Sequence, residues 1–383
     1  MIISRTPFRI TLGGGGTDLP SYYENYGGFI FAMGIDKYMY VMVNPPTVDR
    51  KIRLQYSRSE IVDHVCKIKH ELAREALRLH GIEDKMEISS MADLPAGAGL
   101  GSSSCYLVGL LNCLHHYRRD YVTLSELAEE ACHIELNILR KGIGKQDQYM
   151  AVYGGLTVLE IDRDGRVEVE SVDLGLSSLA TLVSNTHMYY TGVQRDAPDV
   201  LANQDRAARS NKSDDEKRVV DSLHRIKELG YRSLEAIKAE NYDAWGQMLD
   251  EHWQNKKKLS KKVSLPGIDE LYEHVKSEYG VLGGKIVGAG GGGFFLLYCP
   301  ERHKRLEQFM ASRGMPRMHY TVELEGSKVV ANVGSTKSGL YHRRVANGHH
   351  IDVLSRRAGD GKPKPATCGG EAVRPVTAAP SAK

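Results

Sequence analysis

Apolar and polar residues alternate through much of the first 57 residues, which is the pattern of half-buried β-strands. The segments with this pattern are IISRTPFRITL (2–12), GGFIFAMGIDKYMYVMVN (27–44), KIRLQY (51–56), KMEISS (85–90), GGLTVLEI (154–161) and RVEVESV (166–172). Between them the spacing of apolar residues predicts helices over about 60–80, from Ser102 to Tyr117, and over 124–140. The first 175 residues therefore predict a strand-rich α/β domain.

Longer amphipathic helices are predicted in the second half of the chain, over about 198–262 and again at 269–280. The lysine-rich end of this region, NKKKLSKK (255–262), is typical of a solvated helix face. KIVGAGGGGFFLLYC (285–299) predicts a strand, a glycine turn and a second strand. Because 383 residues exceed the usual size of one domain, we expect two, at 1–175 and 176–342.

Composition indicates a globular protein of the cytoplasm. Hydrophobic residues make up 41% of the chain and charged residues 26%. The longest apolar stretches, such as FFLLYC (294–299), are far shorter than the roughly 20 residues of a membrane helix. The N-terminus carries arginines within its apolar part, unlike a secretory signal. The six cysteines show no CxxC pair or metal-ligand spacing. We therefore expect reduced thiols, a cytoplasmic location and no membrane partner.

The positive net charge comes from the end of the chain. Residues 343–383 hold eight Lys/Arg against three Asp/Glu, whereas the rest of the chain has a net charge of −2. Frequent Pro and Gly and few large apolar residues predict a disordered basic tail there. Because no nucleic-acid-binding motif accompanies these charges, we expect no nucleic-acid partner. The sequence leaves the oligomeric state open, a homo-oligomer included.

The segment LPAGAGLGSSS (94–104) places glycines and serines directly before a predicted helix. A helix N-terminus presents unpaired amide groups and the positive end of the helix dipole, and both attract phosphate. Glycines let the backbone close around an anion, and serine hydroxyls can bind phosphate oxygens or Mg²⁺. This pattern favours a nucleoside triphosphate, and a flexible loop with a serine N-cap is the alternative. The predicted nucleotide-binding residues are Gly97, Gly99, Leu100, Gly101, Ser102, Ser103 and Ser104.

Two common nucleotide-binding motifs do not fit. A P-loop requires GxxxxGK[ST], but GGK at 283–285 is followed by Ile286. GAGGGG at 288–293 matches the GxGxxG of dinucleotide-binding proteins, but that motif should open a helix and FFLLY predicts a strand. The sequence therefore excludes a usual P-loop and disfavours a Rossmann dehydrogenase.

Three glycine-rich segments follow one another in the chain: PFRITLGGGGTDLP (7–20), LPAGAGLGSSS (94–104) and KIVGAGGGGFF (285–295). In this order and spacing they resemble the galactokinase, homoserine kinase, mevalonate kinase and phosphomevalonate kinase (GHMP) superfamily, over about residues 1–335. The resemblance implies an α+β GHMP kinase fold, with an N-terminal α/β domain like domain 2 of ribosomal protein S5. It also implies a ferredoxin-like C-terminal domain with added helices, and ATP and Mg²⁺ as cofactors.

The resemblance also implies roles for individual residues. By position, Ser103 and Glu135 hold Mg²⁺, and Asp147, in GKQDQYMAVYGG, faces the hydroxyl that accepts the phosphate. Arg9 of the first segment steadies the transferred phosphoryl group. From the residues alone, Asp147 can instead cap a helical turn, Glu135 can lie on a solvated helix face, and Arg9 can be an exposed strand residue.

The first segment bears on the substrate. Galactokinases carry GEHTDY there, whereas this chain keeps Thr17 and Asp18 and has Gly15 and Gly16 in place of Glu-His. The missing side chains leave room for a larger or differently placed sugar, and a carboxylate such as that of Asp18 can accept two hydroxyl hydrogen bonds. The predicted substrate-binding residues are Gly15, Gly16, Thr17, Asp18, Lys37, Arg195, Gly290 and Gly291.

Within the superfamily, GGGGTDLPSYYENYGG, GIDKY and YYTGVQRD are most similar to bacterial D-glycero-D-manno-heptose 7-phosphate kinases. That similarity implies ATP-dependent phosphorylation of the anomeric C1 hydroxyl of a sugar phosphate. Arg195 is then the candidate cation for the phosphate already on the sugar, with an ordinary surface arginine as the alternative. A fucose-type sugar 1-kinase and a non-catalytic sensor of sugar and ATP are the alternative functions.

Overall fold

The computed structural model describes residues 1–193, 197–210 and 212–333. Arg195 and the predicted tail at 343–383 lie outside the described residues. Within the described part, every helix is too short or too polar to cross a bilayer.

The first sheet has eight strands, most of them from the first half of the chain. Its two long central strands, β1 (Ile2–Gly13) and β2 (Gly28–Asn44), pair antiparallel along nearly their whole length. The path across the sheet is β12-β1-β2-β5-β3-β4, and β6 and β7 extend it beside the first half of β2. The shorter strands are β3 (Ile52–Gln55), β4 (Ser59–Val62), β5 (Met86–Ala92), β6 (Leu156–Ile161), β7 (Val167–Ser171) and β12 (Lys328–Asn332).

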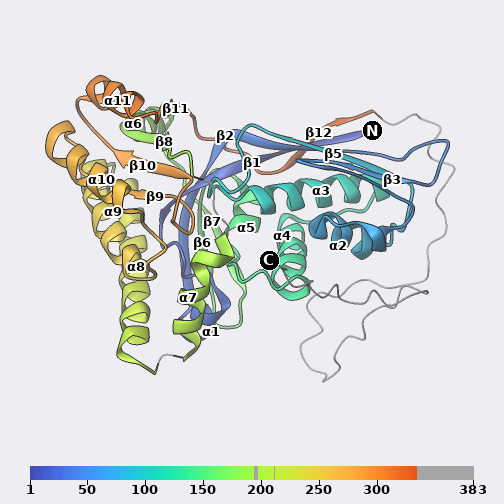
Figure 1. Cartoon of the computed structure of the whole chain (residues 1–383), viewed down its shortest axis with the longest axis horizontal. Coiled ribbons are helices and arrows are strands. Elements are labelled where there is room, and N and C mark those ends of the chain that lie inside the picture. The colour runs from blue at the N-terminus through green and yellow to red at the C-terminus, as the bar shows by residue number, and fades with distance from the viewer. Residues whose placement is uncertain (194–196, 211, 334–383) are drawn as a thin grey trace, which may run out of the picture. The chain divides into compact units, whose positions relative to one another are not determined.

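The helix α3 (Ser102–Arg118) lies along β1 and β2, and its buried side chains pack in the hydrophobic core with those of this sheet (Figure 1). Eleven consecutive residues, Ser104–Leu114, are buried. A helix that is buried on all sides is expected to be apolar on all sides, and YLVGLLNCL is so except at Asn112, which donates to Ser327. Beside it pack α2 (Glu71–Leu79), α4 (Leu124–Cys132) and α5 (Gln146–Tyr153).

The second sheet is antiparallel, in the order β11-β8-β10-β9, and comes from the second half of the chain. Its strands are β8 (Thr186–Tyr190), β9 (Gly283–Ile286), β10 (Phe294–Tyr298) and β11 (Arg317–Met318). The remaining helices are α1 (Pro20–Tyr26), α6 (Leu176–Asn185), α7 (Ala197–Ser210), α8 (Asp214–Lys238), α9 (Tyr242–Lys257), α10 (Pro266–Tyr279) and α11 (His303–Ser312). Because α8 packs on α9 and also on β1 and β2, and α9 packs on β9, these helices connect the two sheets.

Most predicted elements are confirmed, including the strand at FFLLY and the helices between 198 and 262. The helix expected over 60–80 is wrong in its first part, because residues 59–62 pair with β3 as strand β4. A short 3₁₀ helix follows at Val65–Lys67, and the α-helix covers only 71–79. The helix expected over 124–140 ends at Cys132 and continues as a π-helix, His133–Ile138. The α+β class is confirmed. The domain division at residue 175 stays a prediction, and β12 returns from the second half to pair with β1.

Candidate active site

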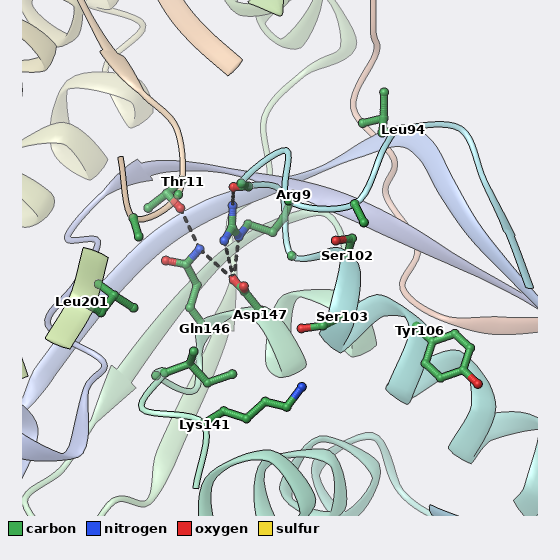
Figure 2. Close-up of a pocket in the computed structure, with 18 of the residues that line it drawn as sticks. Arg9, Thr11, Leu94, Ser102, Ser103, Tyr106, Lys141, Gln146, Asp147 and Leu201 are labelled. Carbon is green, nitrogen blue, oxygen red and sulfur yellow. Dashed lines mark hydrogen bonds and ion pairs between the residues drawn. The ribbon is translucent and has the colours of Figure 1, made fainter. Parts of the chain in front are cut away.

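A cavity of about 770 Å³ is lined on one side by the first sheet and α3, and on the other by α7, α9 and β9. In the close-up of Figure 2, Leu94 and Tyr106 lie at one end of this cavity and Leu201 at the other. Arg9 and Asp147 lie between them, beside the start of α3. All three glycine-rich segments contribute to the walls, so residues that are far apart in the sequence meet here.

The glycine loop before α3 has the geometry of an anion-binding site. Gly97, Gly99 and Gly101 have φ angles of 73°, 80° and 86°, which glycine adopts without strain. The helix begins at Ser102, and its first turn contains no acidic residue. Its free amide groups and dipole therefore favour an anion. The prediction that this loop opens a helix is confirmed.

The third glycine segment packs directly against this loop. A Cβ atom on Gly288 would lie 2.4 Å from the carbonyl oxygen of Gly99, and one on Gly293 would lie 2.3 Å from that of Ala98. No side chain other than hydrogen fits at either contact. The third segment therefore fixes the shape of the loop.

Asp147 and Arg9 form an ion pair in the middle of the cavity. The Nε and Nη2 atoms of Arg9 donate to Oδ1 of Asp147, at 2.8 and 2.5 Å, and Nη1 donates to the carbonyl oxygen of Gly99 at 2.8 Å. Arg9 is 4% exposed, so its interpretation as an exposed strand residue is wrong. Asp147 lies in the first turn of α5 but caps no amide group there, and its side chain remains 28% exposed. The pair thus leaves part of the carboxylate open to the cavity.

Glu135 is fully buried on the π-helix, behind the start of α3. Its Oε1 accepts from Ser103 Oγ at 3.1 Å, and its Oε2 accepts from Ser104 Oγ and Gln148 Nε2, both at 2.6 Å. Burial raises the pKa of this carboxyl, although the hydrogen bond from Ser104 acts in the opposite direction. The solvated-face alternative for Glu135 is wrong. A buried carboxylate next to a serine hydroxyl is an oxygen-only ligand set of the kind that Mg²⁺ prefers.

A second carboxylate marks the end of the cavity that contains Gly15 and Gly16. Asp18 is 7% exposed, and its Oδ2 accepts from the backbone amide of Gln146 at 3.0 Å. Burial raises the pKa of Asp18, and the negative charge of Asp147 raises it further. The Gln146 side chain donates to Thr11 at 2.7 Å and connects this end to β1. Asp18, Gln146 and Thr11 together thus place hydrogen-bond acceptors and donors in one wall of the cavity.

Several predicted site residues do not line the cavity. The hydroxyl of Thr17 donates to the carbonyl oxygens of Gly14 and Phe29, and its side chain is buried, so it shapes the first glycine loop. The ammonium group of Lys37 pairs with Asp36 at 2.8 Å. The other predicted residues outside the cavity lining are Leu100, Ser104, Glu135, Gly290 and Gly291. A role for any of these in binding remains a prediction.

The sequence analysis did not single out six basic residues of the cavity wall: Lys69, His70, Lys141, His252, Lys256 and Lys285. Lys285 begins the third glycine segment, so its position in the motif was the available signal. Lys256 belongs to the lysine-rich stretch interpreted as solvated, yet it is only 8% exposed. That interpretation is wrong for Lys256 but holds for Lys258, Lys261 and Lys262, which are exposed.

Both halves of the chain match domains of one known protein family. Residues 61–155 match the GHMP kinases N terminal domain, and residues 233–314 match the GHMP kinases C terminal domain. The mevalonate kinase of Methanothermobacter thermautotrophicus is 30% identical over 231 residues, which cover 58% of this chain and 68% of that protein. The chain belongs to the GHMP kinase family.

This GHMP kinase is 27% identical over 316 residues to the D-glycero-alpha-D-manno-heptose 7-phosphate kinase of Campylobacter jejuni, covering 79% of the chain and 91% of that protein. A crystal structure of a D-glycero-D-manno-heptose 1-phosphate kinase from Bacteroides thetaiotaomicron has the same fold, with a TM-score of 0.72 at 22% identity. It covers 88% of this chain and 100% of that one. The predicted GHMP kinase fold is confirmed. The predicted enzyme class, a phosphotransferase of this family that acts on a sugar hydroxyl, is confirmed as well.

The contact between Gly288 and Gly99 gives a testable prediction. We expect Gly288→Ala to lower Tm and raise KM for ATP, because the added methyl group overlaps the backbone of the glycine loop. Gly314→Ala is the control, since Gly314 also has a positive φ (76°) but has no neighbouring atom within 4 Å. Backbone strain alone should lower Tm of the control by about 2–4 °C, and Gly288→Ala should lower it at least about twice as much. Equal shifts in Tm with an unchanged KM for ATP would show that the contact is unimportant.

Proposed function

We propose that the protein transfers the γ-phosphoryl group of ATP to the anomeric C1 hydroxyl of D-glycero-D-manno-heptose 7-phosphate, giving the 1,7-bisphosphate. The observation that carries this proposal is the position of the Asp147–Arg9 pair. It lies between a helix N-terminus that favours an anion and the pocket end with the buried carboxylate of Asp18. The similarity to the Campylobacter jejuni enzyme supports the choice of acceptor.

ATP is proposed to bind along the glycine loop. Its phosphates would accept hydrogen bonds from the amide groups of Gly97–Ser103, and its base would occupy the end lined by Leu94, Met91 and Tyr106. Apolar and aromatic side chains suit a purine ring there.

Ser103 and Glu135 are proposed to hold Mg²⁺. Adjacent ligands of an octahedral Mg²⁺ ion lie about 2.9 Å apart, given metal–oxygen distances of 2.0–2.1 Å. Ser103 Oγ and Glu135 Oε1 are 3.1 Å apart, so the two oxygens would be close enough to hold one ion together. When bound, Mg²⁺ would neutralise charge on the β- and γ-phosphates.

In the proposed reaction, the C1 oxygen attacks the γ-phosphorus, the bond to the β-phosphate oxygen breaks, and ADP leaves. Asp147 accepts the proton of the C1 hydroxyl through the part of its carboxylate that Arg9 leaves open. Arg9 fixes the carboxylate and lies near the phosphoryl group, where its charge stabilises the transition state. Both residues thus act by position and charge.

The acceptor is proposed to lie against Gly15, Gly16 and Asp18. Because the glycines have no side chains, the wall can approach a seven-carbon sugar closely. Asp18 would accept hydrogen bonds from sugar hydroxyls, since a buried carboxylate requires such partners.

A panel of acceptors tests this function. ADP release would be measured with heptose 7-phosphate, L-fucose, galactose and mevalonate. We expect the highest kcat/KM with heptose 7-phosphate. A preference for L-fucose would favour the alternative sugar 1-kinase. The L-fucokinase/L-fucose-1-P guanylyltransferase of Bacteroides fragilis is 26% identical to this protein, and the match covers 79% of this chain and 35% of that protein. No turnover with any sugar would favour the sensor.

A further inference from the structure

The cavity wall carries basic side chains that the proposed mechanism does not use. His252 and Lys256 lie one turn apart on α9, and Lys285 lies on the neighbouring strand β9. Lys256 Nζ donates to the carbonyl oxygens of Ile286, at 2.8 Å, and Gly288, so it holds the start of the third glycine segment. Lys285 differs, because the part of the chain that the structure describes provides no hydrogen bond or ion pair for its ammonium group.

Lys285 is therefore a buried cation without a counter-ion among the described residues. It is 2% exposed and faces the cavity. Burial, and next the positive charge of Arg9, lower its pKa to about 7. His252 beside it is no counter-ion, because a histidine side chain is either neutral or positive. Burial and the two neighbouring lysines lower the pKa of its imidazole well below the usual value and so favour the neutral form. An ammonium group out of water is unfavourable unless it is paired, so an anion in the cavity would stabilise this arrangement.

The ligands proposed for this cavity supply such an anion. A sugar hydroxyl needs no cation, whereas a phosphate group does, and charge-assisted hydrogen bonds to phosphate are among the stronger ones in proteins. Lys285 lies within electrostatic reach of Arg9, whose partner Asp147 marks the place of phosphoryl transfer. Arg195, the cation suggested by the sequence, lies outside the described residues.

We propose that Lys285 is a phosphate-binding residue, whose ammonium group receives a phosphate group of the bound substrates beside Arg9. This inference rests on the proposed function for the identity of the ligands. Two sources share the chemistry, namely the phosphate that the sugar acceptor already carries and the γ-phosphate of ATP. Lys256 is already engaged by the backbone, so Lys285 is the side chain whose removal should affect phosphate binding without disturbing the glycine segment.

Lys285→Met tests the proposal, because methionine has a similar length and no charge. Calorimetric titration would give Kd for heptose 7-phosphate and for the unphosphorylated heptose, and for a non-hydrolysable ATP analogue and for ADP. We expect one phosphorylated ligand of these pairs to bind roughly ten- to a hundredfold more weakly to the variant. A loss confined to heptose 7-phosphate identifies the acceptor phosphate, and a loss confined to the ATP analogue identifies the γ-phosphate.

Stability separates this role from a structural one. Because Lys285 is unpaired when no ligand is bound, Tm of ligand-free Lys285→Met should equal or exceed that of the wild type. Lys258→Met is the control, because Lys258, directly after α9, is exposed and its side chain donates only to Asn255, at 3.2 Å. Unchanged affinity for all four ligands would overturn the proposal, and so would a lowered Tm with all four affinities reduced alike. If the wild type does not bind heptose 7-phosphate, the proposed function fails, and the ATP analogue and ADP still test Lys285.

Discussion

Asp147→Asn should lower kcat by about 10²–10⁴-fold while leaving ATP binding intact, because an amide cannot take the proton of the acceptor hydroxyl. The amide oxygen can still accept from Arg9, so the local structure should be retained. Steady-state ADP release would give kcat, and calorimetric titration would give Kd for ATP. The predicted result is therefore a loss of the chemical step alone.

Asp36→Asn is a matched control for this change. Asp36 also pairs with a basic residue, Lys37, but lies outside the cavity lining, so kcat should be unaffected. Turnover of a folded Asp147→Asn variant within about threefold of the wild type, a loss far smaller than the roughly 10²–10⁴-fold expected when a general base is removed, would remove Asp147 from the mechanism. A loss of ATP binding instead would indicate that the carboxylate mainly organises Arg9 and the glycine loop.

The parts of the site that the sequence predicts well are encoded over short distances. The glycine loop and the start of α3 follow from residues 97–104 alone, since left-handed glycines and a following apolar run define where the helix begins. Asp147 and Glu135 came from the resemblance, and the structure brings Asp147 to Arg9 and Glu135 to Ser103. Local pattern and motif order thus predict the reacting centre.

The parts that the sequence misses depend on long-range packing. The spacing of apolar residues assigns 59–62 to a helix, but pairing with β3 makes them a strand. The π-helix at His133–Ile138 turns Glu135 inward, and no apolar periodicity specifies such a wide turn. Lys256 was assigned to solvent because its neighbours in sequence are lysines, yet the packing of α9 on β9 directs it to the backbone of the third glycine segment. Lys285 lies on β9, and its place in the cavity wall likewise depends on this packing, which the sequence does not show.

Glu135→Gln should lower kcat by about 10²–10³-fold and raise the Mg²⁺ concentration needed for half-maximal activity, because the variant lacks the proposed anionic ligand. The glutamine side chain has nearly the same shape and retains one oxygen that can accept from Ser104 or Gln148. ADP release as a function of free Mg²⁺ measures both quantities. The expected loss is thus one of metal-dependent activity.

The stability of this variant distinguishes a metal ligand from a structural carboxylate. Since burial raises the pKa of Glu135, keeping it ionised at neutral pH costs folding free energy, and the uncharged glutamine removes that cost. Tm of Glu135→Gln without Mg²⁺ should therefore not fall. In the control Glu129→Gln, loss of the ion pair with Lys145 (2.7 Å) should lower Tm and leave the Mg²⁺ dependence unchanged. If Glu135→Gln shows this second pattern, the carboxylate serves the fold, and Mg²⁺ must be held by other residues.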